Sequence, residues 1–177
     1  DENGNQRSAG SRTFAYDLGN RLVSTTQGNT TATYSYDGDG TRLQASSGQQ
    51  ASRKTAFLWD VNGALPQLAL ERDGAGTLLR RYTYGTQRIS MTSGTSTSYY
   101  HRDGLGSSVH LTSASGQTQW TWSYEPFGAL RTEQKAPGNQ PHNPMRFTGE
   151  YLDPTGLYHL RARQYDPQLG RFLTRDP

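Results

Sequence analysis

The sequence predicts an all-β protein built from antiparallel hairpins. Stretches such as TATYSY at residues 31–36 and QWTWSY at 119–124 alternate with the period of two that a half-buried strand requires. Most of these stretches run into a polar residue that is followed three places later by glycine, the chemistry of a tight turn. No stretch has convincing helical periodicity, and residues 159–165 are the nearest candidate. Together these observations favour a long antiparallel sheet.

The strand–turn unit repeats along the chain. Its aspartate is expected to cap the turn through a side-chain oxygen, and its glycine to supply a positive φ. The pairs are Asp37 and Gly40, Asp60 and Gly63, Asp73 and Gly76, Asp103 and Gly106, and Glu125 and Gly128. In the first copy the glycine, Gly19, follows Asp17 by two positions instead of three. In another copy Ser113 stands where the others have an acidic residue, three positions before Gly116. Successive acidic turn residues lie 20, 23, 13, 30 and 22 positions apart, which argues against a solenoid with fixed rungs.

The amino-acid composition favours an ordered β-rich domain and argues against disulfides, membrane spans and nucleic-acid binding. Hydrophobic residues make up only 31% of the 177, but 11 tyrosines and a net charge of +3 favour a β-rich domain over disorder. The absence of cysteine excludes disulfides and thiolate metal sites. No apolar run is long enough for a membrane span. The pI is near 9.3, but the arginines are scattered and form no basic stripe, so no nucleic-acid partner is expected.

No cofactor or metal site is predicted. The stretch DGDGT at residues 37–41 imitates the start of a calcium loop, but Thr41 and Gly48 occupy positions where such a loop needs oxygen ligands. The four histidines lack metal-ligand spacing. Trp120, Trp122 and Tyr124 share one strand face, where core packing is favoured over a sugar-binding surface.

The last part of the chain contains three Asp-Pro pairs, at Asp153, Asp166 and Asp176. Such pairs open turns, and two carboxylates placed close together can also act as an acid–base pair. A turn from Asp153 to Gly156 is predicted between strands at 147–152 and 157–163, and a second turn from Asp166 to Gly170.

The repeats resemble a known family. Tyr16-Asp17, Tyr36-Asp37 and their degenerate copies look like the tyrosine-aspartate (YD) repeats of Rhs proteins, and residues 146–177 are similar to the Rhs core-associated segment. The resemblance implies a large hollow β-shell, as in Rhs proteins, Tc-toxin C-components and teneurins. In the bacterial toxins this shell encloses a C-terminal toxic domain. It also implies three regions: YD hairpins at 1–130, a polar linker at 131–143 and a core-associated segment at 144–177 that turns inward as a plug.

The resemblance gives Asp176 a different expectation from the other two aspartates. It would open the Asp-Pro-x-Gly motif that supplies the upstream carboxylate of a self-cleaving pair, whose downstream partner this sequence does not contain. The chain is therefore not expected to be an enzyme by itself.

A plug must also neutralise its buried charges. We expect Glu150 and the turn aspartates 153 and 166 to pair with some of the arginines of the segment, namely Arg146, Arg161, Arg163 and Arg171.

Two functions compete on this sequence. The first is a segment of a secreted or cell-surface bacterial shell whose partners are further YD repeats and an enclosed toxin domain. The second is an extracellular surface or filament module that binds glycans or neighbouring subunits through open sheet edges.

Overall fold

The computed structural model describes residues 1–48 and 53–176 and confirms the all-β prediction. Its strands form two antiparallel sheets, one of 13 strands in sequence order and one of four. The large sheet comprises β1 (Ser8–Ala9), β2 (Arg12–Tyr16), β3 (Leu22–Gln27), β4 (Thr30–Tyr36), β5 (Arg42–Ser47), β6 (Lys54–Asp60), β7 (Gln67–Asp73), β8 (Leu78–Tyr84), β9 (Arg88–Ser93), β10 (Ser96–Arg102), β11 (Ser108–Ser113), β12 (Thr118–Tyr124) and β13 (Leu130–Lys135).

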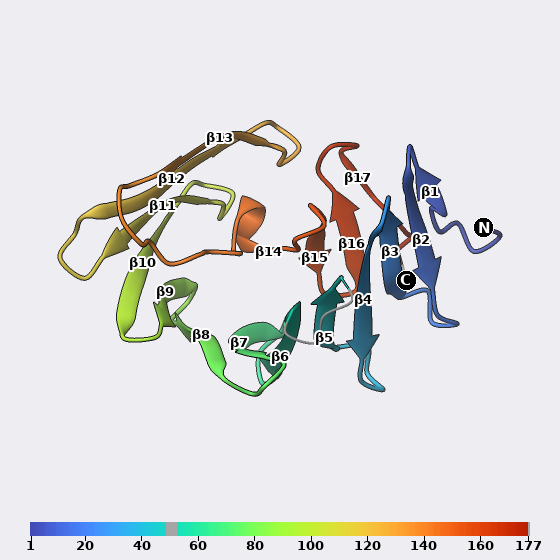
Figure 1. The fold of residues 1–177 in the computed structure, drawn as a ribbon, viewed down its shortest axis with the longest axis horizontal. Helices are drawn as coiled ribbons and strands as arrows, with labels where there is room; N and C mark the ends of the chain where they lie inside the picture. Colours follow the sequence, from blue (N-terminus) through green and yellow to red (C-terminus); the bar gives the residue numbers. More distant parts are fainter. Residues whose placement is uncertain (49–52, 177) are drawn as a thin grey trace.

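The small sheet belongs to the C-terminal segment. It follows the short 3-10 helix η2 (Phe147–Gly149) and contains β14 (Tyr151–Leu152), β15 (Tyr158–Leu160), β16 (Arg163–Asp166) and β17 (Arg171–Phe172). Figure 1 shows the strands of the large sheet following an arc, with the orange and red C-terminal elements on its inner side. No helix in the described part of the chain is long and apolar enough to cross a membrane.

The two faces of the large sheet differ because its strands alternate. The outer face carries hydroxyl pairs between neighbouring strands, such as Thr33 with Ser46 at 2.6 Å and Ser123 with Thr132 at 2.6 Å. The inner face carries the aromatic and aliphatic core, which explains how a chain with few hydrophobic residues folds around a single packed interface.

The C-terminal segment completes this core. Met145 and Tyr151 pack into a cluster that includes Leu111 and Trp122 of the large sheet. Leu157 and Leu173 pack into a second cluster formed with the first strands. Leu111 of the first cluster and Leu157 of the second are fully buried (0% exposed), so both clusters are closed between the inner face and the C-terminal segment.

Most turns follow one backbone pattern. The amide of Gly40 donates to the Asp37 carbonyl at 3.2 Å, the amide of Asp37 donates to the Thr41 carbonyl at 3.0 Å, and Gly40 has φ +86°. Each of these strands also has a register shift immediately before the residue that precedes the acidic turn residue, as at Ser35/Tyr36 before Asp37. Gly76, Gly106 and Gly128 occupy the same turn position with φ of +87°, +87° and +86°.

Two turn assignments need correction. Gly63 lies in a bend and is not among the positive-φ residues, because the loop between β6 and β7 is longer than the others. The first repeat does not end one residue early at Gly19. Asn20 occupies the glycine position with φ +59°, and its amide donates to the Asp17 carbonyl at 3.0 Å. Asparagine tolerates this left-handed conformation better than most residues, so the three-residue spacing is kept.

Three expected boundaries also change. The linker predicted at 131–143 starts later, because Leu130–Lys135 forms β13. The strand predicted at 147–152 is mostly η2, and only Tyr151–Leu152 is extended. The strand predicted at 157–163 is interrupted by a tight turn at Arg161, where φ is +57°, and Pro177, the last residue of the predicted core-associated segment, lies outside the described residues.

Candidate functional site

The inner face of the large sheet is organised by an aromatic residue that stands just before the turn at the end of β4, β6, β8 and β12. Tyr36 donates its hydroxyl to the Leu22 carbonyl at 2.8 Å, and Tyr124 donates to the Ser108 carbonyl at 2.8 Å. Tyr84 and Trp59 make the same kind of contact, with the carbonyls of Leu68 and Arg42 respectively. Each of these four repeats is thereby tied to the one before it.

Sequence reasoning identified the aromatic but missed this role. The signal was the choice of tyrosine over phenylalanine, because a partly buried phenol needs a hydrogen-bond partner. Burial raises the pKa of Tyr36 to about 12, so its hydroxyl stays protonated and remains a donor at physiological pH.

A buried ion pair joins the two sheets at their centre. Arg42 Nη1 of β5 lies 2.7 Å from Asp153 Oδ2, and the two side chains are 0% and 1% exposed. The guanidinium lies against the rings of Tyr34, Phe57 and Tyr151, at 5.4, 4.7 and 5.3 Å from their centroids. Burial raises the pKa of Asp153, and Arg42 opposes that shift.

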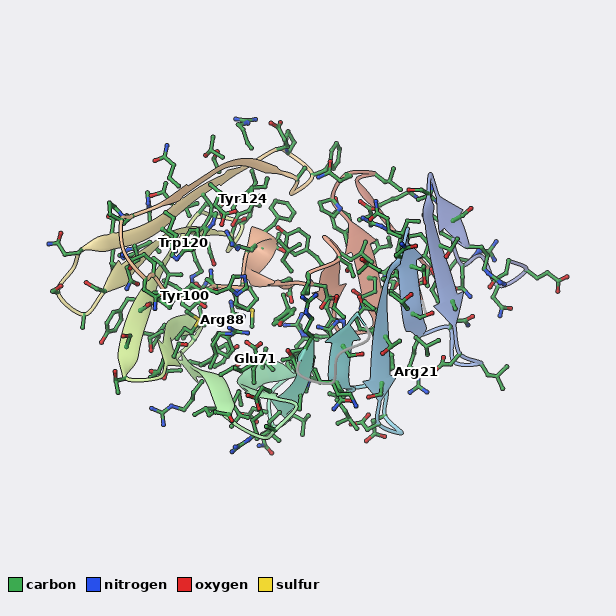
Figure 2. All side chains as sticks on the ribbon, in the orientation of Figure 1. Arg21, Glu71, Arg88, Tyr100, Trp120 and Tyr124 are labelled. Carbon is green, nitrogen blue, oxygen red and sulfur yellow. The ribbon has the colours of Figure 1, made fainter. Side chains whose placement is uncertain are left out.

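A second buried carboxylate, Glu71 of β7, gathers donors from both sheets. It receives two hydrogen bonds of 2.7 Å from Arg80, and one from Tyr82 of the neighbouring strand. Tyr151 of the C-terminal segment donates to the same carboxylate at 3.1 Å. Figure 2 shows Glu71 on the inner side of the arc.

The predicted pairing within the C-terminal segment holds for one pair and fails for the turn aspartates. Arg161 pairs with Glu150 at 2.8 Å. Asp153 instead pairs with Arg42, and Asp166 with Arg12 at 3.4 Å, so both carboxylates bind arginines of the large sheet. The reason is geometric: the small sheet faces the large one, so its nearest charges lie across the interface.

The other arginines of the segment find different environments. Arg146 pairs with Glu133 of β13 at 3.0 Å and lies 4.2 Å from the Trp122 ring centroid. Arg163 pairs with Asp176 at 3.0 Å, and that aspartate is largely exposed. Arg171 is exposed in β17, opposite Asp166. Charge neutralisation is therefore divided: Arg161 and Arg163 pair within the segment, whereas Arg146, Asp153 and Asp166 pair with residues of the large sheet.

The structure places the predicted turn residues as follows. Asp37, Asp73 and Asp103 each accept a 2.8 Å hydrogen bond from the amide four residues later. Asp60 accepts from the Asn62 amide at 3.0 Å, although its loop differs. In the C-terminal segment, Gly156 and Gly170 have φ of +80° and +64°.

The aromatic face of β12 is covered. Trp122 is 2% exposed, the indole nitrogen of Trp120 donates to the Pro141 carbonyl at 2.8 Å, and the two rings stack at 5.6 Å. The linker and Arg146 cover this face, which favours core packing of Trp120, Trp122 and Tyr124 over a sugar-binding surface.

Comparison with known proteins places this arrangement in a family. No protein-family model matches the chain. The whole chain aligns at 32% identity with the tRNA3(Ser)-specific nuclease WapA of Bacillus spizizenii, and 45% of it aligns at 38% identity with the toxin protein Tse5 of Pseudomonas aeruginosa. The chain is a YD-repeat segment of the Rhs type.

The family chains are much longer. This chain spans 8% of WapA and 6% of Tse5. Its fold matches part of the Photorhabdus luminescens Tc holotoxin pore over 100% of this chain and 9% of that one, with a TM-score of 0.75 at 23% identity. The YD-repeat segment thus has the fold of a section of a far larger β-structure.

Proposed function

We propose that this YD-repeat segment is the end section of a shell wall that encloses a polypeptide, with the C-terminal small sheet as the plug. The observation that carries the proposal is the buried Arg42–Asp153 pair, which fixes the plug to the inner face 111 residues away in sequence. A segment seated against the inner face must bury and match such charges, so the pair supports the proposal. The bacterial toxins among the relatives support a secreted or cell-surface setting and a toxic guest.

The proposal also gives Asp176, close to the C-terminal end of the sequence, a role in self-cleavage. Asp176 is exposed and forms an ion pair with Arg163. Asp153 and Asp166 instead form ion pairs with arginines of the large sheet. Asp176 is therefore the aspartate that remains accessible to a second carboxylate, supplied by sequence beyond residue 177. In such a longer chain it acts as one half of a self-cleaving pair.

The test uses a longer chain that carries its guest. Asp176→Asn is expected to stop self-cleavage while leaving the folded yield and the protease resistance of the guest unchanged. Asp153→Asn, the matched Asp-Pro control, is expected to lower the folded yield. The division of roles is overturned if Asp153→Asn blocks cleavage in a normally folded shell. The enclosure itself is overturned if the guest is digested as fast inside the intact protein as in isolation.

A surface or filament module remains a second candidate because of one observation. All six residues of β13 are exposed, and β13 lies at an edge of the large sheet. An exposed edge pairs readily with another strand. In a shell this edge is covered by another part of the same shell, whereas in a filament it binds a neighbouring chain. Mass that rises with concentration in light scattering of the longer protein favours the filament, and a constant monomer mass favours the shell.

A further inference from the structure

A cavity of about 260 Å³ lies where the C-terminal segment meets strands β7 to β10. Its charged lining is three arginines, Arg88, Arg102 and Arg161, and one glutamate, Glu150. Arg161 is neutralised by Glu150 at 2.8 Å. Three positive charges and one negative charge leave a net charge of +2 around the cavity.

Arg102 breaks the repeat at this place. It is the last residue of β10, follows the same register shift as Tyr36 and Tyr84, and precedes Asp103 of the turn. In the neighbouring repeats this position holds an aromatic residue that donates to the previous repeat. Here a cation replaces that aromatic ring, and the cavity occurs at the same place.

Arg88, the first residue of β9, is held rigidly beside it. Its guanidinium carbon lies 5.6, 5.5 and 5.5 Å from the ring centroids of Tyr82, Tyr84 and Tyr100, and its Nε donates to the Tyr84 hydroxyl at 3.2 Å. Figure 2 shows Arg88 and Tyr100 on the inner side of the arc. The stack fixes the guanidinium and leaves its terminal nitrogens for a ligand.

Neither Arg88 nor Arg102 forms an ion pair with a carboxylate in the described part of the chain. The remaining residues, 49–52 and 177, include no acidic side chain. Burial and the positive charge of the neighbouring Arg88 lower the pKa of Arg102. This direction agrees with two arginines that lie close together without a carboxylate between them.

The backbone around the cavity is strained. Three non-glycine residues in the described chain have positive φ, and two of them, Thr148 at +51° and Arg161 at +57°, line this cavity. Gly149 has φ +76°, and a Cβ there would lie 3.1 Å from the Gly106 carbonyl oxygen. Such strain is kept where the surroundings hold it, often at binding sites.

We propose that this cavity is a binding site for an organic carboxylate, held by Arg88 and Arg102. The planar guanidinium groups match a carboxylate. Leu68, Met145 and Trp59 also line the cavity, and this apolar wall suits the carbon skeleton of the ligand better than inorganic phosphate. The source is a free small acid or an acidic side chain of a polypeptide. The inference goes beyond the shell and does not depend on it, since every residue belongs to this chain.

The experiment titrates the 15N-labelled 177-residue chain with acetate, acetyl-Gly-Glu-Gly-amide and, as a neutral control, acetyl-Gly-Gln-Gly-amide. Shifts are expected for the amides of Gly106, Thr148 and Gly149 with both acids and not with the glutamine peptide. Tighter binding of the peptide than of acetate identifies a polypeptide source, and equal binding identifies a free acid. Inorganic phosphate is expected to bind at least tenfold more weakly than the acids.

Two variants locate the site. Arg88→Gln and Arg102→Gln are each expected to weaken carboxylate binding about tenfold or more, because each removes a charge-assisted contact. Arg81→Gln, which removes the same charge from the outer face of β8, is expected to have no effect. Arg102 is only half-buried, so its variant keeps the fold even if Arg88→Gln does not. The proposal is overturned if acids cause no shifts at these amides, if phosphate binds as tightly, or if Arg102→Gln binds like Arg81→Gln.

Discussion

The turn aspartates of the repeats and Asp153 of the C-terminal segment share a backbone conformation but differ in what their carboxylates bind. In the repeats, Asp73 caps its own turn, accepting from the amides of Ala75 and Thr77 at 2.9 and 2.8 Å. In the C-terminal segment, Asp153 makes the same backbone turn to Gly156 at 2.8 Å, yet its side chain binds Arg42 of the large sheet.

This difference shows that some turn aspartates stabilise local structure, whereas others stabilise contacts between segments that are far apart in sequence. The repeat aspartate acts within five residues, so a hairpin can form wherever the motif occurs. The carboxylate of Asp153 can bind Arg42 only after the small sheet has packed against the inner face, so this ion pair depends on the assembly of the two sheets.

Asp153→Asn should be the most damaging change. It leaves the Arg42 guanidinium buried without a carboxylate, and breaking a buried pair in this way costs about 3–5 kcal/mol. Urea unfolding followed by tryptophan fluorescence measures the loss in the free energy of unfolding. Adding Arg42→Met to Asp153→Asn should restore part of the loss, because the uncompensated charge is gone. A loss below about 1 kcal/mol for Asp153→Asn would contradict the role of the pair as the central link.

His159 should make the interface sensitive to acid. Burial, together with Arg42 and Arg161, lowers the pKa of His159 well below its usual value. In the unfolded chain His159 becomes protonated near pH 6.5, whereas in the folded chain it stays neutral at that pH. The free energy of unfolding therefore falls as the pH drops below 6.5. The slope for this one group approaches about 1.4 kcal/mol per pH unit.

The control for this pH effect is a matched pair of variants. His159→Gln removes the titration and can still accept the hydrogen bond that links Gln164 to His159 Nδ1 at 2.8 Å. Between pH 6.5 and 5 its stability should change less than that of the unmodified chain. His110→Gln, the same substitution at an exposed histidine of β11 outside the interface, is the matched control. Parallel profiles for all three proteins would exclude His159 as the cause.

The limits of sequence reasoning follow the same division. Alternation and the acid–glycine spacing were sufficient to predict an all-β antiparallel sheet and most of its turns, because those signals are local. The Asn20 turn was missed because only glycine was considered for positive φ. The partners of Asp153 and Asp166 were missed because Arg42 and Arg12 lie 111 and 154 residues away, and no local pattern encodes that contact.

Gly76→Ala should show the cost of the turn backbone alone. Gly76 has φ +87° and nothing within 4 Å of an added Cβ, so the loss of about 1–2 kcal/mol comes from conformation and not from a clash. Gly63→Ala is the matched control, since Gly63 is outside the positive-φ region and the added Cβ would lie 3.7 Å from the Leu65 carbonyl oxygen, an ordinary contact. Thermal unfolding should leave Gly63→Ala within about 0.5 kcal/mol of the parent. Equal losses at both glycines would mean that Gly63 needs the same turn conformation.

Asp73→Ala should have the smallest effect of the four principal changes, and its additivity sharpens the comparison most. It removes two hydrogen bonds to exposed turn amides that water can replace, so the loss should be about 0.5–1.5 kcal/mol. Because Asp73 and Asp153 share no hydrogen-bond partner, the double variant Asp73→Ala with Asp153→Asn should lose the sum of the two single losses within about 0.5 kcal/mol. The measurement is urea unfolding of the four proteins of this cycle. A coupling above about 1 kcal/mol would show that hairpin turns and sheet assembly depend on each other, and the separation into local and long-range aspartates would fail.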